Sequence, residues 1–125
     1  MFAWNINGVK NKFLDPDYLR LIPSYDILVI SETHFGQRLK CPDGFCCVSR
    51  SKCLKSKKPR GGVALFKRKT CMVQMDALDM DFRDCVVVYF RDCDVVMAAI
   101  YIPPSNSIYF DDIYFTYMVV VFAVP

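Results

Sequence analysis

Polar residues that could do chemistry follow apolar, strand-like runs at three places in the sequence. Asn5 and Asn7 alternate along the first run, so a strand would place both amides on one face. The segment Ser31-Glu32-Thr33-His34 directly follows the apolar run 27–30, and Tyr101 comes at the end of a later run, before a pair of prolines. Polar groups at strand ends are where layered α/β folds collect their active sites. A carboxylate at such a low-dielectric edge would suit a hard divalent cation such as Mg²⁺.

Each of these places also has a purely structural interpretation. An Asn-x-Asn-Gly sequence is typical of a turn, a glutamate after a strand can cap a helix, and a tyrosine before prolines can pack in the core. His34 is the only histidine, and the sequence assigns no acid or nucleophile beside it. Spacing alone therefore predicts a soluble α/β domain with a candidate metal edge built from oxygen ligands.

The N-terminal third predicts a strand, a helix and a second strand. Residues 2–6 form a short apolar run that ends at an Asn-Gly turn pair. Asp15 and Pro16 predict the helix start, as N-cap and first helical residue, and Pro23 closes the helix. The run 27–30 contains only Ile, Leu and Val and predicts a strand covered on both faces. This order indicates a βαβ-like opening, and so an α/β or α+β layered fold.

The middle of the chain predicts four more strands, and the last part predicts a helix. Asp111 and Asp112 favour a helix N-terminus, so we expect a helix over residues 113–122. The polar sequence at 91–94 predicts a hairpin turn between the last two of the four strands. These strands are expected over residues 45–48, 62–66, 86–90 and 95–101.

The composition is that of one globular domain. The 125 residues are 54% hydrophobic and 23% charged, which excludes a disordered or low-complexity chain. The N-terminus lacks the basic start and apolar core of a signal peptide. The longest nearly uncharged stretch, residues 113–125, is shorter than the roughly 20 residues that a membrane span needs. We therefore expect an intracellular protein, nuclear or cytoplasmic, that has no membrane partner.

The seven cysteines are expected to be free thiols. Their number is odd, and a chain without an export signal is expected in a reducing compartment. Zinc is disfavoured because Cys46 and Cys47 are adjacent, the chain lacks paired Cys-x-x-Cys motifs and it has a single histidine. We interpret the cysteines as structural thiols.

Positive charge is concentrated in one stretch of the chain. Residues 50–69 contain nine Lys or Arg and no acid. Such a stretch can contact a phosphate backbone, or it can be a solvated loop whose charges keep the protein soluble. Because no aromatic residue is interleaved with the basic ones of residues 50–60, that part of the stretch carries no signal for base stacking.

Four motifs follow one another in a recognisable order. They are Trp4-Asn5-Ile6-Asn7-Gly8, Ile30-Ser31-Glu32-Thr33-His34, Arg60-Gly61-Gly62-Val63-Ala64 and Ala99-Ile100-Tyr101-Ile102-Pro103-Pro104. The series resembles the endonuclease/exonuclease/phosphatase superfamily, and within it the apurinic-like endonuclease domain of non-LTR (LINE-type) retrotransposons. The resemblance covers nearly the whole chain, but only about the first half of the family's domain.

The resemblance implies a fold and a set of site residues. Residues 1–125 would be the N-terminal part of a four-layer α/β sandwich, with one mixed or antiparallel sheet and flanking helices. Glu32 looks like the family's metal-binding glutamate, which holds a catalytic Mg²⁺ or Mn²⁺. Asn5 looks like the asparagine that helps to position metal and phosphate, and Tyr101 looks like the tyrosine that contacts the scissile phosphate. Asn7 stands where related apurinic enzymes often have aspartate, which implies a supporting hydrogen-bond role.

The family's reaction implies a DNA partner. It is metal-assisted phosphodiester hydrolysis, in which water attacks phosphorus while the metal offsets charge on the phosphate and on the leaving oxygen. In LINE-type elements this reaction nicks target DNA and supplies the primer for reverse transcription. The resemblance implies that the basic stretch faces DNA. Contacts with DNA are expected from Asn7, Lys55, Lys57, Lys58 and Arg60.

Two motifs of the family do not occur in this chain. The 125 residues contain neither the Gly-Asp-x-Asn strand end nor the closing Ser-Asp-His motif, which supply a water-activating aspartate, an asparagine and a histidine. His34 cannot replace that histidine because it follows the metal glutamate rather than closing the domain. We therefore expect the chain to be inactive as it stands. A partial sandwich would also leave one apolar inner face uncovered, including residues 117–124, so we expect marginal stability or self-association through that face.

Three other functions remain open on the sequence. A non-catalytic nucleic-acid-binding module would explain the basic stretch and the missing catalytic motifs. A functionless remnant of a decayed element would explain the missing motifs alone. An inositol-polyphosphate or sphingolipid phosphodiesterase of the same superfamily would share the metal motif.

Overall fold

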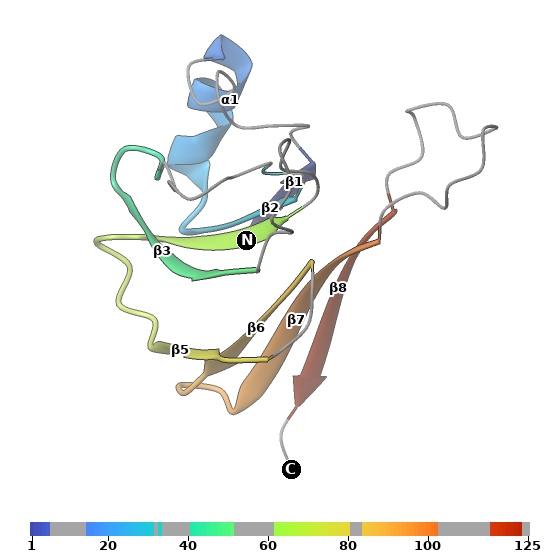
Figure 1. The fold of residues 1–125 in the computed structure, drawn as a ribbon. Helices are drawn as coiled ribbons and strands as arrows, with labels where there is room; N and C mark the ends of the chain where they lie inside the picture. Colours follow the sequence, from blue (N-terminus) through green and yellow to red (C-terminus); the bar gives the residue numbers. More distant parts are fainter. Residues whose placement is uncertain are drawn as a thin grey trace, which may run out of the picture.

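The computed structural model has an α+β arrangement, in which the described residues form two four-stranded sheets and one short α-helix (Figure 1). It describes residues 1–5, 15–31, 33, 41–51, 62–80, 84–102 and 116–123, and of residues 2–5, 101–102 and 116–123 it describes the backbone. The α+β class expected from the sequence is therefore confirmed.

The first sheet has the strand order β1-β2-β4-β3. Strand β1 (Phe2–Asn5) runs parallel to β2 (Ile27–Ser31), which confirms the βαβ-like opening. Strand β4 (Val63–Arg68) pairs antiparallel with β2 and with β3 (Phe45–Arg50). The side chains of Leu28, Val29 and Ile30 are fully buried, as expected for a strand that is covered on both faces.

Helix α1 (Pro16–Leu21) begins where its capping residues predict. Asp15 is the N-cap, and its carboxylate accepts a hydrogen bond from the backbone N–H of Asp17 at 2.9 Å. Pro16 occupies the first helical position, where its missing N–H is no loss. A short 3₁₀ turn, η2 (Ile22–Ser24), which contains Pro23, follows the helix and leads into β2.

The second sheet is antiparallel throughout, with the order β5-β6-β7-β8. Strands β6 (Cys85–Phe90) and β7 (Val95–Ile102) form the predicted hairpin around residues 91–94. Strand β5 (Met75–Leu78) was not predicted from the sequence. Its four residues are half-buried or exposed and none of them is β-branched. The sequence therefore gives little local signal for a strand.

The helix expected over residues 113–122 is wrong. Residues Thr116–Ala123 form strand β8 instead, which pairs antiparallel with β7 along its whole length. This segment contains three consecutive valines with a tyrosine and a phenylalanine nearby, and these residue types favour a strand. The pairing with β7 gives their backbone groups partners, which outweighs the helix signal of the two preceding aspartates.

The described residues form three layers, which are helix α1, the first sheet and the second sheet (Figure 1). Two apolar clusters lie between these layers. The first cluster lies between α1 and the first sheet, with Tyr18 and Ile22 packed on Leu28 and Phe66. The second lies between the two sheets, where residues of β2 and β4 meet residues of β6 and β7. Its buried members are Val29, Val63, Leu65, Val86, Val88, Met97 and Ala99.

The expectation of a single sheet is therefore wrong. The second sheet, which continues directly from the first along the chain, folds back and covers the inner face of the first sheet at β2 and β4 through the second cluster. The sequence patterns predict the strands, but they do not predict how many sheets the strands form. The number of sheets depends on where the chain turns back. The side chains of residues 117–124 lie outside the described ones, so self-association through them stays a prediction.

Among the described residues, no helix is long and apolar enough to cross a membrane. Six cysteines, at positions 41, 46, 47, 71, 85 and 93, are unpaired thiols in the structure. Cys53 lies outside the described residues.

The thiol of Cys47 makes stability depend on pH in alkaline solution. Burial of this side chain against the first cluster raises its pKa from 9.0 to about 11. Since the thiol ionises earlier in the unfolded chain, its contribution is complete below about pH 9 and is lost as pH rises from 9 to 11. The free energy of unfolding, measured with urea, should fall between pH 8 and pH 11. In Cys47→Ser this fall should be smaller than in the unmodified protein by roughly 1–2 kcal/mol. Cys93→Ser, at an exposed site, should leave the fall unchanged, and an equal fall in both variants would refute the assignment.

Candidate metal and nucleic-acid edge

The parallel pair β1–β2 brings the first two motifs together. Asn5 and Ser31 are Cα partners at the carboxyl ends of these neighbouring strands. Glu32 is the next residue after Ser31 but lies outside the described residues. The backbones of the first motif and of the start of the second motif are therefore neighbours at this edge of the sheet. The roles assigned to the Asn5 and Glu32 side chains remain predictions.

Gly62 and Val63, from the third motif, form a corner beside this pair. Val63, the first residue of β4, is the Cα partner of Ser31. Two hydrogen bonds join Ser51 to Val63. The Ser51 N–H donates to the Val63 carbonyl at 2.8 Å, and the Ser51 Oγ accepts from the Val63 N–H at 2.9 Å. Gly62 has a φ of +95°, a conformation that favours glycine over residues with a Cβ. Its carbonyl accepts a hydrogen bond from the N–H of Thr33 at 3.3 Å.

Asp84 ties the second sheet to the same corner. It directly precedes β6, and its Oδ1 accepts a hydrogen bond from the N–H of Gly62 at 2.8 Å. Its backbone φ of +54° is a left-handed conformation, which aspartate tolerates better than most residues. Sequence reasoning missed this residue. The available signal was an aspartate directly before a strand, but its partner lies 22 residues away and could not be inferred locally.

Tyr101 lies at the same end of the sandwich. It is the second-last residue of β7 and the Cα partner of Tyr117 in β8. The residue before it, Ile100, is paired with Cys85, which directly follows Asp84. The hydrogen bond from Gly62 to Asp84 joins the corner beside β1 and β2 to the start of β6, which is paired with the end of β7. The ends of β1, β2 and β7 therefore lie at one edge of the molecule. We call this edge, defined by Asn5, Ser31, Gly62, Asp84 and Tyr101, the motif edge.

A buried hydroxyl at the motif edge has no partner. Ser31 is fully buried, and its Oγ makes no hydrogen bond among the described residues. It lies two residues beyond Val29, so strand alternation directs it toward the second sheet. An unpaired buried hydroxyl costs about 1–3 kcal/mol, and such an atom calls for a partner. Beside Asn5 and directly before Glu32, this oxygen fits the donor chemistry that Mg²⁺ or Mn²⁺ requires.

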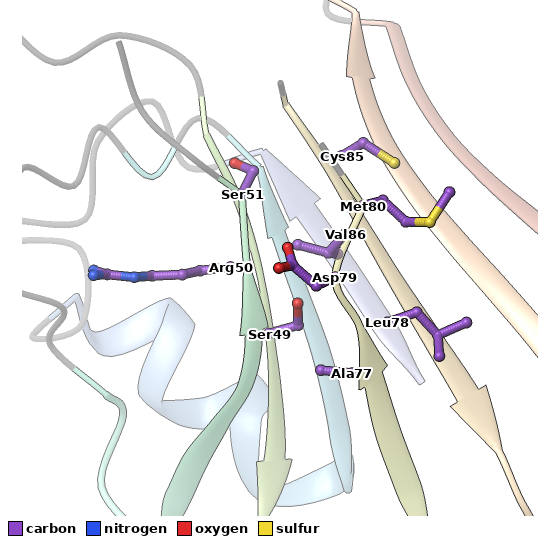
Figure 2. Close-up of a pocket in the computed structure, with 9 residues that line it drawn as sticks. All are labelled: Ser49, Arg50, Ser51, Ala77, Leu78, Asp79, Met80, Cys85 and Val86. Carbon is purple, nitrogen blue, oxygen red and sulfur yellow. The ribbon is translucent and has the colours of Figure 1, made fainter. Parts of the chain in front are cut away.

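A small cavity opens next to the corner, between the end of β3 and the segment leading from β5 to β6 (Figure 2). Its volume is about 170 Å³. Figure 2 shows the Arg50 side chain extending away from the side of its strand on which Asp79 lies. The cavity therefore offers hydroxyl groups and a single carboxylate. Its lining residues are Ser49, Arg50, Ser51, Ala77, Leu78, Asp79, Met80, Cys85 and Val86.

The basic segment is anchored at the motif edge by both of its ends. Ser51 and Gly62 flank residues 52–61, and Ser51 is hydrogen-bonded to Val63, the neighbour of Gly62. The segment between them carries five Lys or Arg and no acid, so a run of positive charge begins and ends at this edge. The predicted contact residues themselves lie outside the described residues. They are Asn7, Lys55, Lys57, Lys58 and Arg60.

The described residues form the frame of a site rather than a complete ligand set. Within residues 1–5, 15–31, 33, 41–51, 62–80, 84–102 and 116–123, no group of three or more His, Cys, Asp or Glu could hold a metal. Glu32, the predicted ligand, and His34 are both outside that set. No protein-family model, curated protein or solved structure matches this chain, so the case for a function rests on its own residues and their arrangement.

Proposed function

We propose that these residues form the metal- and DNA-binding half of a Mg²⁺-dependent phosphodiesterase site, similar to that of retrotransposon endonucleases. The observation that carries the proposal is the pairing of Asn5 with Ser31, the residue before Glu32. This pair lies at the same edge as Tyr101, near the end of β7. On this proposal the two sheets are the central layers of the family's four-layer sandwich.

Each residue would have a distinct task. The carboxylate of Glu32 would hold the cation, and the Asn5 amide would orient the cation and a phosphate oxygen. The phenol of Tyr101 would donate a hydrogen bond to the same phosphate. A bound Mg²⁺ would neutralise negative charge on the phosphate and on the leaving oxygen. These residues include no general base, and neither Gly-Asp-x-Asn nor Ser-Asp-His occurs in the sequence, so we propose binding without cutting.

A non-catalytic, metal-independent nucleic-acid-binding module is the second candidate. The observation that favours it is the basic segment 52–61, whose ends at Ser51 and Gly62 sit on the motif edge. Backbone phosphates would be its ligands, without recognition of bases. The two candidates differ in whether DNA binding responds to Mg²⁺ and to Glu32.

Binding of duplex DNA, followed by fluorescence anisotropy over a range of salt, tests the proposal. We expect affinity to fall steeply with salt and to rise when Mg²⁺ is added. Replacing Lys55, Lys57 and Lys58 with Gln should reduce the slope of log affinity against log salt by about 0.9 for each phosphate that the protein no longer neutralises. Arg20→Gln/Arg91→Gln removes two exposed charges that lie outside the basic stretch and serves as the control.

The outcomes separate the candidates. Binding that ignores Mg²⁺ and Glu32→Gln, yet weakens in the lysine variant, would favour the metal-independent module. Absence of binding at low salt would reject both candidates. Nicking of supercoiled plasmid in Mg²⁺ that is abolished by Glu32→Gln would show that the missing motifs are dispensable, contrary to the proposed inactivity.

A further inference from the structure

A chain of two hydrogen bonds connects the second sheet to the residue after Glu32. The carboxylate of Asp84 accepts from the N–H of Gly62 at 2.8 Å, and the Gly62 carbonyl accepts from the N–H of Thr33 at 3.3 Å. Thr33 is 2% exposed, and Gly62 is also buried, so the peptide groups between them are held away from bulk water. Hydrogen bonds in such surroundings are strengthened by the low dielectric.

Gly62 cannot hold this position through β4 alone. Its φ of +95° lies outside the strand region, and β4 begins only at Val63. Ser51 fixes Val63 on one side, which leaves the Gly62 N–H to be fixed from elsewhere. Asp84 supplies that partner from the other sheet, and its own left-handed backbone brings its carboxylate toward Gly62. The bond to a carboxylate is charge-assisted, and so stronger than one to a neutral acceptor.

We propose that Asp84 is a positioning residue for the metal site, acting through Gly62 and Thr33 to fix the backbone around Glu32. Ser31 is fixed by its pairing with β1 and β4, and Thr33 by Gly62, so Glu32 lies between two anchored residues. The inference rests on the proposed function in so far as Glu32 holds the cation.

Two substitutions at Asp84 separate its hydrogen bond from its charge. Asp84→Gly keeps the left-handed backbone but removes the acceptor. Asp84→Asn keeps an acceptor oxygen and tolerates that backbone but removes the charge. Asp94→Gly is the matched control because Asp94 has a φ of +52° and accepts a hydrogen bond from Tyr89 at the opposite end of β6.

The experiment measures amide hydrogen exchange in the metal-free protein and the affinity for Mn²⁺ by electron paramagnetic resonance. Asp84→Gly should speed exchange at Gly62 and Thr33 by about 10-fold, which is the loss of roughly one hydrogen bond. It should also weaken Mn²⁺ binding by about 10-fold, the effect typical of groups that orient a ligand. Asp84→Asn should restore both to near the unmodified protein, and Asp94→Gly should change neither.

Each contrary outcome has a separate meaning. Unchanged exchange at Thr33 in Asp84→Gly would overturn the connection itself. Faster exchange with unchanged Mn²⁺ affinity, in a protein where Glu32→Gln weakens binding, would overturn the positioning role and leave the proposed function standing. Equal loss in Asp84→Asn and Asp84→Gly would assign the effect to the carboxylate charge instead. Absence of Mn²⁺ binding in the unmodified protein would reject the proposed function, and the positioning role with it.

Discussion

Replacing Phe66 with alanine should lower the free energy of unfolding by about 3–5 kcal/mol. Phe66 is fully buried in β4, and its Cα partners are Leu28 in β2 and Cys47 in β3. It belongs to the cluster that joins α1 to the first sheet, so its loss leaves a cavity between two layers. Since small domains are stable by only about 5–15 kcal/mol, this one change should remove a large part of the total.

Urea unfolding followed by circular dichroism measures this effect. Met72→Ala is the control because Met72 is 85% exposed and its truncation removes little buried surface. The control should change stability by no more than about 0.5 kcal/mol. A loss in Phe66→Ala as small as that of the control would mean that the helix does not pack on this sheet as described.

Replacing Glu32 with glutamine should reduce the affinity for Mn²⁺ by roughly 100-fold, since even groups that only orient ligands contribute 10–100-fold. Glutamine has nearly the same size as glutamate but carries no charge, and hard divalent cations depend on carboxylate oxygens. The neighbouring backbone is anchored at Ser31 and Thr33, so the substitution should leave the fold intact. Titration of Mn²⁺ followed by electron paramagnetic resonance measures the change without requiring any cutting of DNA.

Asp43→Asn is the matched control for this prediction. It removes one carboxylate from an exposed position just before β3, at the end of the first sheet opposite to Asn5 and Ser31. We expect its Mn²⁺ affinity to equal that of the unmodified protein. If Glu32→Gln and Asp43→Asn bind Mn²⁺ equally well, Glu32 is not a ligand, and the resemblance to the metal-dependent family loses its central residue.

The start of the helix and several strands of both sheets could be predicted from the sequence. The capping pair Asp15-Pro16, the apolar run 27–30 and the hairpin turn at 91–94 are local signals, and the structure confirms each of them. Strand β8 shows the limit of such signals. Its valines and aromatic residues suit a strand, but the preceding aspartates suit a helix, and only pairing with β7 decides between the two.

The candidate site divides in the same way. The sequence by itself determined which residues could hold a cation or contact a phosphate, because carboxylate, amide and phenol groups have fixed chemistry wherever they lie. It could not determine that Asn5 lies beside Ser31 or that β7 ends at the same edge, since these relations join residues far apart in the chain. The bond from Gly62 to Asp84 depends on two sheets folding face to face, and that packing of one apolar face on another was decided by the tertiary structure alone.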